Sequence, residues 1–206
     1  MDTLYAHHNV DLEEMTILMA KQALGFGVVL NAEYSVPEID GWMTPIELLF
    51  LYHQARKMDS VVEIGSWKGR STHALASACK GTVYACDHWL GSPNDITSTI
   101  IMTEDVYSTF VQNTKHFTNL QVLRGRASES VAQFADQSVD MVFIDGGHTF
   151  ADVHQDITLW LPKTRKLICG HDYSQQFPEV VAAVHTHFGH PDGVWGTIWY
   201  KQLQHG

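Results

Sequence analysis

The chain has 206 residues, 45% of them hydrophobic, which is enough to bury one substantial apolar core in a single domain. Its 13 basic and 23 acidic residues give a net charge of -10 with histidine neutral. A surface this acidic disfavours nucleic acid or an anionic membrane as the main partner. No apolar run reaches the roughly 18 residues that are needed to span a bilayer.

The cysteines and the first residues indicate a reducing compartment. The three cysteines, Cys79, Cys86 and Cys169, are odd in number and form no CxxC pair. Cys86 and Cys169 lie in apolar, strand-like runs, so we expect buried free thiols. The start Met1-Asp2-Thr3 lacks the basic region and apolar core of a signal peptide. We therefore expect a cytoplasmic protein.

Two helix start signals precede the first predicted strand. Asp11-Leu12-Glu13-Glu14 is typical of a capping box, and apolar residues then recur at helical spacing as far as Phe26. We expect residues 1–40 to form a helical extension that either packs over the main domain, 41–206, or serves as a lid. Thr44-Pro45-Ile46-Glu47 predicts a second helix, with Thr at the N-cap, Pro at the first helical position and Glu at N3.

From residue 61 onward the chain alternates between strand and helix patterns. Strands are predicted at 61–64, 82–86, 120–123, 139–144, 166–170 and 194–201, and helices at about 71–79, 104–116, 128–135, 151–161 and 178–188. Such alternation predicts an α/β fold with a doubly wound, mostly parallel, Rossmann-like sheet. The predicted loop at 88–103 is long for a compact α/β domain, so it is either functional or mobile.

The central stretch of the sequence is the strand Val61–Ile64 with the turn that follows it. Gly65 and Gly69 lead from this strand into a helix, the arrangement by which α/β proteins present backbone N–H groups to a ligand. An ordinary strand-to-helix turn is the alternative. Glu63 argues against it, because a carboxylate in a buried strand is costly unless something pairs with it.

The spacing of this turn also bears on the cofactor. The turn lacks the GxGxxG fingerprint with which a dinucleotide's pyrophosphate is bound. Glu63 would also repel a diphosphate. A cationic nucleoside without phosphates fits better, which points to S-adenosylmethionine rather than NAD.

Ligands of an open parallel sheet bind where the strands end. The stretches that follow the predicted strands are Gly65–Ser71, Asp87-His88, Gly125–Ser128, Asp145–His148 and His171-Asp172. Asp87 could accept hydrogen bonds from ribose hydroxyls. Each acid could instead cap a neighbouring element, and each histidine could be structural.

Four stretches resemble known methyltransferases. Val62–Thr72 resembles motif I of the class I S-adenosylmethionine-dependent methyltransferases. Gly41–Leu48, Phe143–Phe150 and Gly170–Tyr173 are similar to a small-molecule subgroup that includes the macrocin-type sugar O-methyltransferases. The resemblance covers about residues 41–200. The combination of Ile144–His148 (IDGGH) with Gly170–Tyr173 (GHDY) favours the metal-dependent branch of the O-methyltransferases.

The resemblance implies a role for each matching residue. The glycine turn would hold one part of the cofactor, the end of the second strand would hold the ribose and border the adenine, and the residues after the third strand would lie at the edge of the adenine. The implied cofactor-binding residues are Glu63, Gly65, Ser66, Trp67, Gly69, Ser71, Asp87, His88, Ala127, Ser128 and Asp145. Asp145 and Asp172 match magnesium ligands, and His171 aligns with a ligand position in catechol-type enzymes. His148 matches the macrocin-type general base, and Asp145 would share the catalytic centre with it.

The chemistry of these residues agrees with the resemblance. Two carboxylates at neighbouring strand ends can bind Mg²⁺, which eases deprotonation of a substrate hydroxyl, and an imidazole can accept that proton. We expect methyl transfer to a hydroxyl of a sugar-like or phenolic small molecule. A metal-independent or N-directed methyltransferase, and a silent S-adenosylmethionine-binding fold, stay open. The identity of the third metal ligand also stays open, with Glu104 and Asp105 as candidates. The oligomeric state stays open as well, and a homo-oligomer is one of the alternatives.

Overall fold

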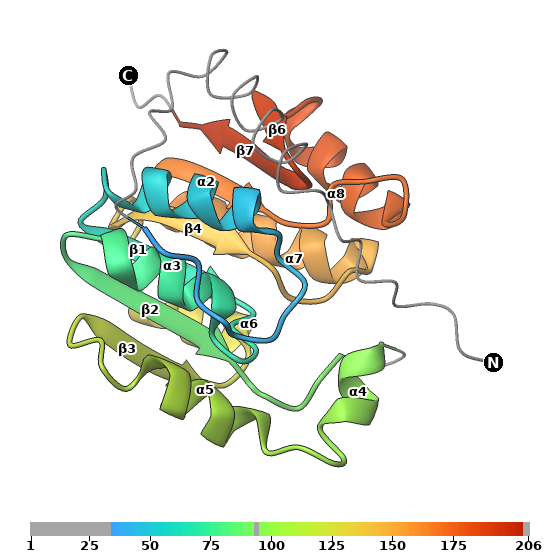
Figure 1. Ribbon diagram of the computed structural model, residues 1–206. Coiled ribbons are helices and arrows are strands. Elements are labelled where there is room, and N and C mark those ends of the chain that lie inside the picture. Colours follow the sequence, from blue (N-terminus) through green and yellow to red (C-terminus); the bar gives the residue numbers. More distant parts are fainter. Residues whose placement is uncertain (1–33, 93–94, 204–206) are drawn as a thin grey trace, which may run out of the picture. The chain divides into compact units, whose positions relative to one another are not determined.

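A computed structural model describes residues 34–92 and 95–203 of the chain (Figure 1). The predicted helix that begins near Asp11 and most of the 1–40 extension lie outside these residues. The extension, and its role as packing helix or lid, therefore stay predictions.

A seven-stranded sheet forms the centre of the described part, in the order β3-β2-β1-β4-β5-β7-β6. Its strands are β1 (Ser60–Ile64), β2 (Thr82–Asp87), β3 (Leu120–Arg124), β4 (Val139–Ile144), β5 (Thr164–Gly170), β6 (Gly193–Trp195) and β7 (Ile198–Gln202). The pairs among β1 to β5 are parallel, and β7 runs antiparallel to both β5 and β6. The predicted doubly wound, mostly parallel sheet is confirmed. The strand order reverses between β1 and β4, which is where such sheets bind ligands.

Helices cover both faces of the sheet (Figure 1). One face carries α2 (Pro45–Ala55), α3 (Arg70–Ala78) and α5 (Val106–Thr114), and the other carries α6 (Ala127–Ser130), α7 (Phe150–Trp160) and α8 (Pro178–Phe188). Each strand supplies side chains to both layers of helices, because successive side chains of a strand point to opposite faces of the sheet. Val62 and Val142 pack in one cluster with Ile157 of α7 and Val184 of α8. Ala85 of β2 packs with Phe110 of α5.

Three predicted elements differ in detail from the structure. The single strand predicted at 194–201 is a hairpin of β6 and β7, because Gly196, at φ 62°, reverses the chain between them. The predicted loop at 88–103 contains the short helix α4 (Ile96–Ile100). The helix predicted at 128–135 is α6 followed by a 3₁₀ turn at Val131–Gln133, and a second 3₁₀ turn (Leu161–Lys163) follows α7.

The cysteines agree with the sequence prediction. Cys79, Cys86 and Cys169 are free and buried, which confirms the expectation of buried thiols. Within residues 34–92 and 95–203, no helix is both long and apolar enough to cross a membrane. The cytoplasmic location stays a prediction.

One buried acid explains an interruption in the apolar strand β4. Asp140 is fully buried, and its Oδ2 accepts the backbone N–H of Asp59 at 2.8 Å. Its Oδ1 lies 2.8 Å from Nε of Arg165 and 3.2 Å from Nζ of Lys166. Burial by itself would raise the pKa of Asp140, but these donors and cations hold that pKa below its ordinary value. Asp140 therefore fastens the end of the sheet opposite to the ligand-binding edge.

Replacing Asp140 with Ala should lower the free energy of unfolding by about 2 kcal/mol, since it removes the charged buried acceptor of the Asp59 N–H and of the half-exposed Arg165 and Lys166. Urea unfolding followed by circular dichroism measures the loss. Asp136→Ala is the matched control, because Asp136 forms an exposed pair with Lys163 at 2.6 Å and should cost less than about 1 kcal/mol. Equal losses in the two variants would contradict the role of Asp140.

Candidate active site

The parallel strands end side by side, and we call this border of the sheet the carboxyl edge. Backbone hydrogen bonds continue beyond the strands there. The N–H of Gly65 donates to the carbonyl of Cys86 at 2.9 Å, that of Asp145 to Ile64 at 2.7 Å, and that of His171 to Ile144 at 3.0 Å. The ends of β1, β4 and β5 are thereby held in one row, with the predicted cofactor turn beside the predicted metal ligands.

The glycine turn is pressed against the end of β4. Gly65 has φ 84°, and a Cβ there would lie 2.0 Å from the carbonyl oxygen of Asp145, so no other residue fits without moving the backbone. Trp67 also has a left-handed backbone, at φ 47°, which is unusual for a residue with a large side chain. Gly69, at φ 92°, ends the turn as the N-cap of α3. The turn is tight and closely packed.

Glu63 lies fully buried beneath this turn. Its Oε2 accepts hydrogen bonds from the hydroxyls of Ser66, at 2.7 Å, and Thr72, while its buried Oε1 has no hydrogen-bond partner among the residues that the structure describes. Burial raises the pKa of Glu63 to about 7, although the hydroxyls of Ser71, Thr72 and Ser66 act in the opposite direction. Two residues predicted to touch the cofactor, Ser66 and Ser71, are thus buried and directed toward Glu63.

Asp87 holds the same turn from the end of β2. Its Oδ2 accepts the backbone N–H groups of Ser66 and Trp67, both at 2.9 Å, and its Oδ1 accepts that of Trp89 at 2.7 Å. A carboxylate has about four acceptor positions, so one is left for a ligand. The ribose role of Asp87 stays a prediction. His88 accepts the N–H of Leu90 through Nδ1 at 3.0 Å.

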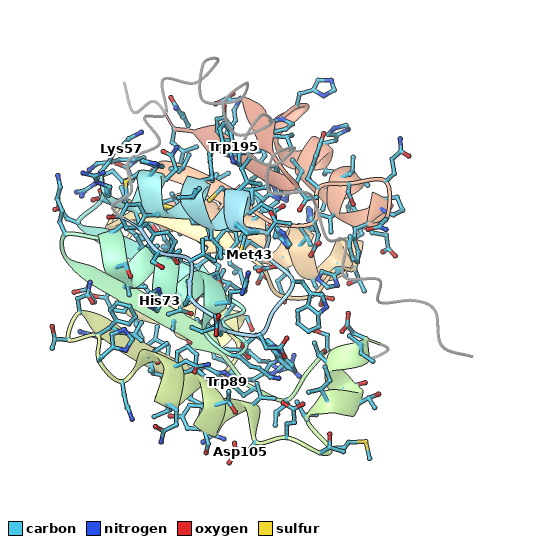
Figure 2. All side chains as sticks on the ribbon, in the orientation of Figure 1. Met43, Lys57, His73, Trp89, Asp105 and Trp195 are labelled. Carbon is cyan, nitrogen blue, oxygen red and sulfur yellow. The ribbon has the colours of Figure 1, made fainter. Side chains whose placement is uncertain are left out.

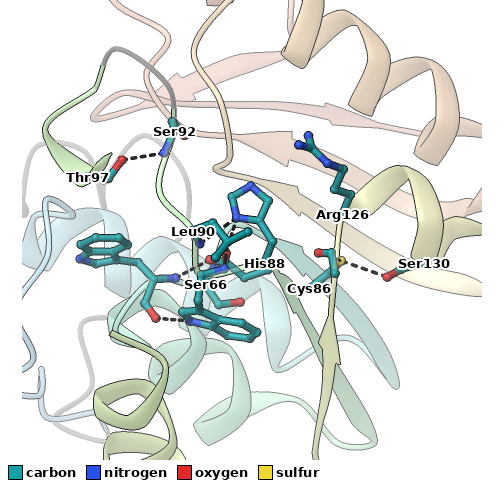
Figure 3. Close-up of polar contacts among 12 residues, drawn as sticks. Ser66, Cys86, His88, Leu90, Ser92, Thr97, Arg126 and Ser130 are labelled. Carbon is teal, nitrogen blue, oxygen red and sulfur yellow. Dashed lines mark hydrogen bonds and ion pairs between the residues drawn. The ribbon is translucent and has the colours of Figure 1, made fainter. Parts of the chain in front are cut away.

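The predicted adenine edge lies next to Asp87. The N–H of Gly125 donates to the carbonyl of Asp87 at 2.9 Å, which brings the start of α6, with the half-buried Ala127 and Ser128, to the second strand end. Figure 3 shows the neighbouring contact between Cys86 Sγ and Ser130 Oγ, at 3.4 Å. The structure therefore groups both predicted adenine-side elements, although no contact there tests their role.

The predicted metal ligands form one cluster. Nδ1 of His171 lies 3.4 Å from Oδ1 of Asp145 and 3.4 Å from Oδ1 of Asp172. One ligand atom from each of the three residues lies within 4.8 Å of the others. Asp172 has φ 61°, a sparsely populated conformation that is found at functional sites. Two carboxylate oxygens and one imidazole nitrogen fit a divalent cation.

His148, the predicted base, borders this cluster. Its Nε2 lies 3.0 Å from Oδ2 of Asp172, its Nδ1 lies 3.4 Å from Oδ2 of Asp95, and its ring packs against Phe177 at 4.7 Å between centroids. Burial by itself would lower the pKa of His148, but Asp172, with Asp145 and Asp95, raises it above its ordinary value. Together with Gly146 and Gly147, His148 and the cluster line a small pocket.

The two acids suggested as third metal ligand serve other purposes. Glu104 pairs with the buried Lys68 at 2.6 Å, and Asp105 caps α5 by accepting the N–H of Ser108 at 3.0 Å. Lys68 also pairs with Asp40 at 2.7 Å, which ties the segment before α2 to the glycine turn. Neither Glu104 nor Asp105 belongs to the cluster of ligand atoms found among the described residues.

Two acids near the cluster escaped the sequence analysis. Asp95 lies in the predicted loop and is the N-cap of α4, where its Oδ1 accepts the N–H of Thr97 at 2.9 Å. A polar residue just before Ile-Thr is an N-cap signal that could have indicated this helix. Glu47 was recognised only as a helix start signal, yet its Oε1 lies 3.4 Å from Nε2 of His171.

The segment before α2 lies against the start of α3. Nε of Arg70 donates to the carbonyl of Met43 at 2.9 Å, and its Nη1 donates to that of Ile39 at 2.5 Å. Figure 2 labels Met43, and Trp89 lies below it there, near the end of β2. The indole N–H of Trp89 donates to the carbonyl of Trp67 at 2.7 Å. The indole of Trp89 therefore lies beside the glycine turn.

Comparison with known proteins gives one family. Residues 62–173, over half of the chain, match the family model described as a methyltransferase domain. The protein y4gI of Sinorhizobium fredii, which is described as uncharacterised, is 25% identical over 176 residues that cover 77% of this chain. The chain spans 19% of the length of that relative.

Solved structures share the fold. The O-methyltransferase NovP superposes with a TM-score of 0.60 at 16% identity, over 77% of this chain and 79% of its own. A putative O-methyltransferase from Klebsiella pneumoniae superposes with a TM-score of 0.59 at 14% identity, over 92% of this chain and 97% of its own. An O-methyltransferase from Bacillus cereus in complex with SAH superposes with a TM-score of 0.56 at 17% identity, over 93% of this chain and 90% of its own. At these identities the likeness establishes the fold.

The raised pKa of Glu63 predicts a specific pH dependence of stability. The folded pKa of about 7 lies above the ordinary 4.5, so the stabilisation is complete below about pH 4.5 and is lost as the pH rises through 7. The cofactor-free protein should lose about 3 kcal/mol of unfolding free energy relative to Glu63→Gln between pH 4 and pH 8. Urea unfolding of both proteins across this range measures the difference. A constant difference would show that folding does not shift the pKa of Glu63.

Proposed function

The chain belongs to the family of methyltransferase domains, and on that basis we propose that it transfers a methyl group from S-adenosylmethionine to a hydroxyl of a small molecule, sugar-like or phenolic, with the help of a divalent cation. The observation that carries the proposal is the cluster of Asp145, His171 and Asp172 beside the glycine turn, with His148 at its border. On this proposal, the row of strand ends would bring the cofactor and the acceptor next to each other.

The surroundings of the glycine turn support a cationic cofactor. Asp87 has one acceptor position left after three backbone bonds, at the end of β2 beside the turn. A carboxylate there opposes a diphosphate and tolerates a sulfonium and an ammonium group. S-adenosylmethionine, when bound, supplies an electrophilic methyl group. The main chain from Gly65 to Gly69 would orient it, with Asp87 at the ribose and His88, Ala127 and Ser128 around the adenine.

The cluster and His148 account for activation of the acceptor. A divalent cation held by Asp145, His171 and Asp172 would lower the pKa of a hydroxyl placed beside it. Mg²⁺ prefers oxygen ligands, whereas the imidazole nitrogen also suits Mn²⁺. His148 would take the proton of the hydroxyl, whose oxygen forms a bond to the methyl carbon. The carbon–sulfur bond breaks, its electron pair goes to sulfur, and S-adenosylhomocysteine is left.

A metal-independent methyltransferase is the second candidate, and the surroundings of His171 favour it. The ring lies within 3.4 Å of carboxylate oxygens from Glu47, Asp145 and Asp172. Burial opposes protonation, but these carboxylates raise the pKa of His171 far above its ordinary value. The imidazolium would then supply the positive charge that a cation otherwise provides. Chelation distinguishes the two mechanisms.

The proposal predicts methyl transfer that depends on both Asp145 and a cation. Radiolabelled S-adenosylmethionine is incubated with a panel of hydroxylated sugars and phenols, and methylated product is counted. EDTA should abolish transfer and added Mg²⁺ or Mn²⁺ should restore it, since the cation lowers the pKa of the hydroxyl. Asp145→Ala should lower the rate by at least about 100-fold, the scale of losing a group that stabilises developing charge, while the circular dichroism spectrum stays that of the wild type.

Asp152→Ala provides a matched control for Asp145. Asp152 comes from the same stretch, but its Oδ2 binds the Thr149 hydroxyl at 2.6 Å at the start of α7, so transfer should persist. Transfer that is undiminished by EDTA would support the metal-independent mechanism. Transfer to none of the acceptors, or near-normal transfer by Asp145→Ala, would contradict the proposal.

A further inference from the structure

The stretch Gly41–Leu48 resembles a methyltransferase motif, yet nothing in the proposed function uses it. The structure connects it to the cluster through Glu47. We propose that Glu47 is a positioning residue: its carboxylate holds the imidazole of His171 by Nε2, so that Nδ1 faces Asp145 and Asp172 and can bind the cation. This inference rests on the metal set of the proposed function and adds a residue from outside the strand ends.

Glu47 is fixed in place from two sides. It is the third residue of α2 and only 2% exposed. Its Oε2 accepts the backbone N–H of Thr44 at 2.8 Å and the Thr44 hydroxyl at 2.7 Å. Its Oε1 accepts the N–H of Thr197 at 2.8 Å and the Thr197 hydroxyl at 2.9 Å, from the turn between β6 and β7. The two oxygens therefore serve different parts of the fold.

The turn between β6 and β7 leaves room for this carboxylate. A Cβ at Gly196, which has φ 62°, would lie 2.6 Å from Oε1 of Glu47, so glycine is needed for the close approach. Oε1 is therefore seated against the same turn from which Thr197 donates to it.

His171 has one ring nitrogen on each side. Nε2 is buried, and the carboxylate oxygen that faces it in the described part of the chain is Oε1 of Glu47, at 3.4 Å. Nδ1 lies 3.4 Å from a carboxylate oxygen of Asp145 and of Asp172. Histidines that bind metals usually donate the other N–H to a carboxylate, which fixes the tautomer and the ring orientation. Glu47 occupies the position of that carboxylate, on the side of the ring away from the cluster.

A purely structural role for Glu47 makes a different prediction. A carboxylate that only joins α2 to the β6–β7 turn would affect stability through either oxygen, and cation affinity through neither. The chain offers a matched pair of variants for this question. Thr44→Val and Thr197→Val each remove one hydroxyl from the same carboxylate, the first at Oε2 and the second at Oε1, the oxygen nearest His171.

The test measures binding of Mn²⁺ alone, by electron paramagnetic resonance of the free ion, to the full chain without cofactor or acceptor. Glu47→Gln should weaken Mn²⁺ binding by about 10- to 100-fold, the effect of losing such a supporting carboxylate. Thr44→Val should bind as the wild type does. Should Glu47→Gln not fold, Thr197→Val replaces it, with an expected loss of about five-fold, the equivalent of one hydrogen bond.

Three results would overturn the inference. The first is wild-type Mn²⁺ affinity in Glu47→Gln, or in Thr197→Val where that variant replaces it. The second is a loss of Mn²⁺ affinity in Thr44→Val equal to that in the test variant, and the third is no Mn²⁺ binding by the wild type. The proposed function fails separately. A wild type that transfers methyl groups without binding Mn²⁺ overturns the role of Glu47 and that of the cation, but leaves methyl transfer to a hydroxyl intact. A wild type whose Mn²⁺ affinity depends on Glu47, but which methylates no acceptor, overturns only the proposed function.

Discussion

The close approach of Gly65 to the backbone of Asp145 is the constraint on which the carboxyl edge depends. The N–H of Asp145 donates to Ile64, and the missing side chain of Gly65 leaves room for the Asp145 carbonyl. A single methyl group at Gly65 would separate the end of β1 from the end of β4. The cofactor turn and the acidic cluster are adjacent because these two backbones touch, which is the proximity that transfer between two bound molecules requires.

Buried carboxylates then hold the pieces around this contact, and each has its own donors. Glu63 takes hydroxyls from the glycine turn and α3, and Asp87 takes three backbone N–H groups. Glu47 joins α2 to the β6–β7 turn. Buried polar groups are costly unless they are bonded, so such a network specifies one arrangement of the loops. Among the described residues, Oε1 of Glu63 and Nε2 of His171 are buried without a hydrogen bond, and Nε2 faces Oε1 of Glu47 at 3.4 Å.

The sequence predicted the parts of the site that depend on local order along the chain. Runs of β-branched residues predicted β1 and β4, and residues that directly follow a strand must lie at the carboxyl edge, so Asp145 and His171 could be placed together. Glu47 could not, because its partner Thr197 lies 150 residues away and only the packing of α2 on the hairpin joins them. Asp95 was missed because α4 has only five residues, too few to show a repeated helical spacing.

The central claim is that the glycine turn holds S-adenosylmethionine rather than a dinucleotide. Isothermal titration calorimetry of the purified chain with S-adenosylhomocysteine, and separately with NAD, tests it most directly. The buried acid at Glu63 and the absence of a GxGxxG turn predict saturable binding of S-adenosylhomocysteine and no heat of binding for NAD. Binding of NAD without binding of S-adenosylhomocysteine would contradict the account.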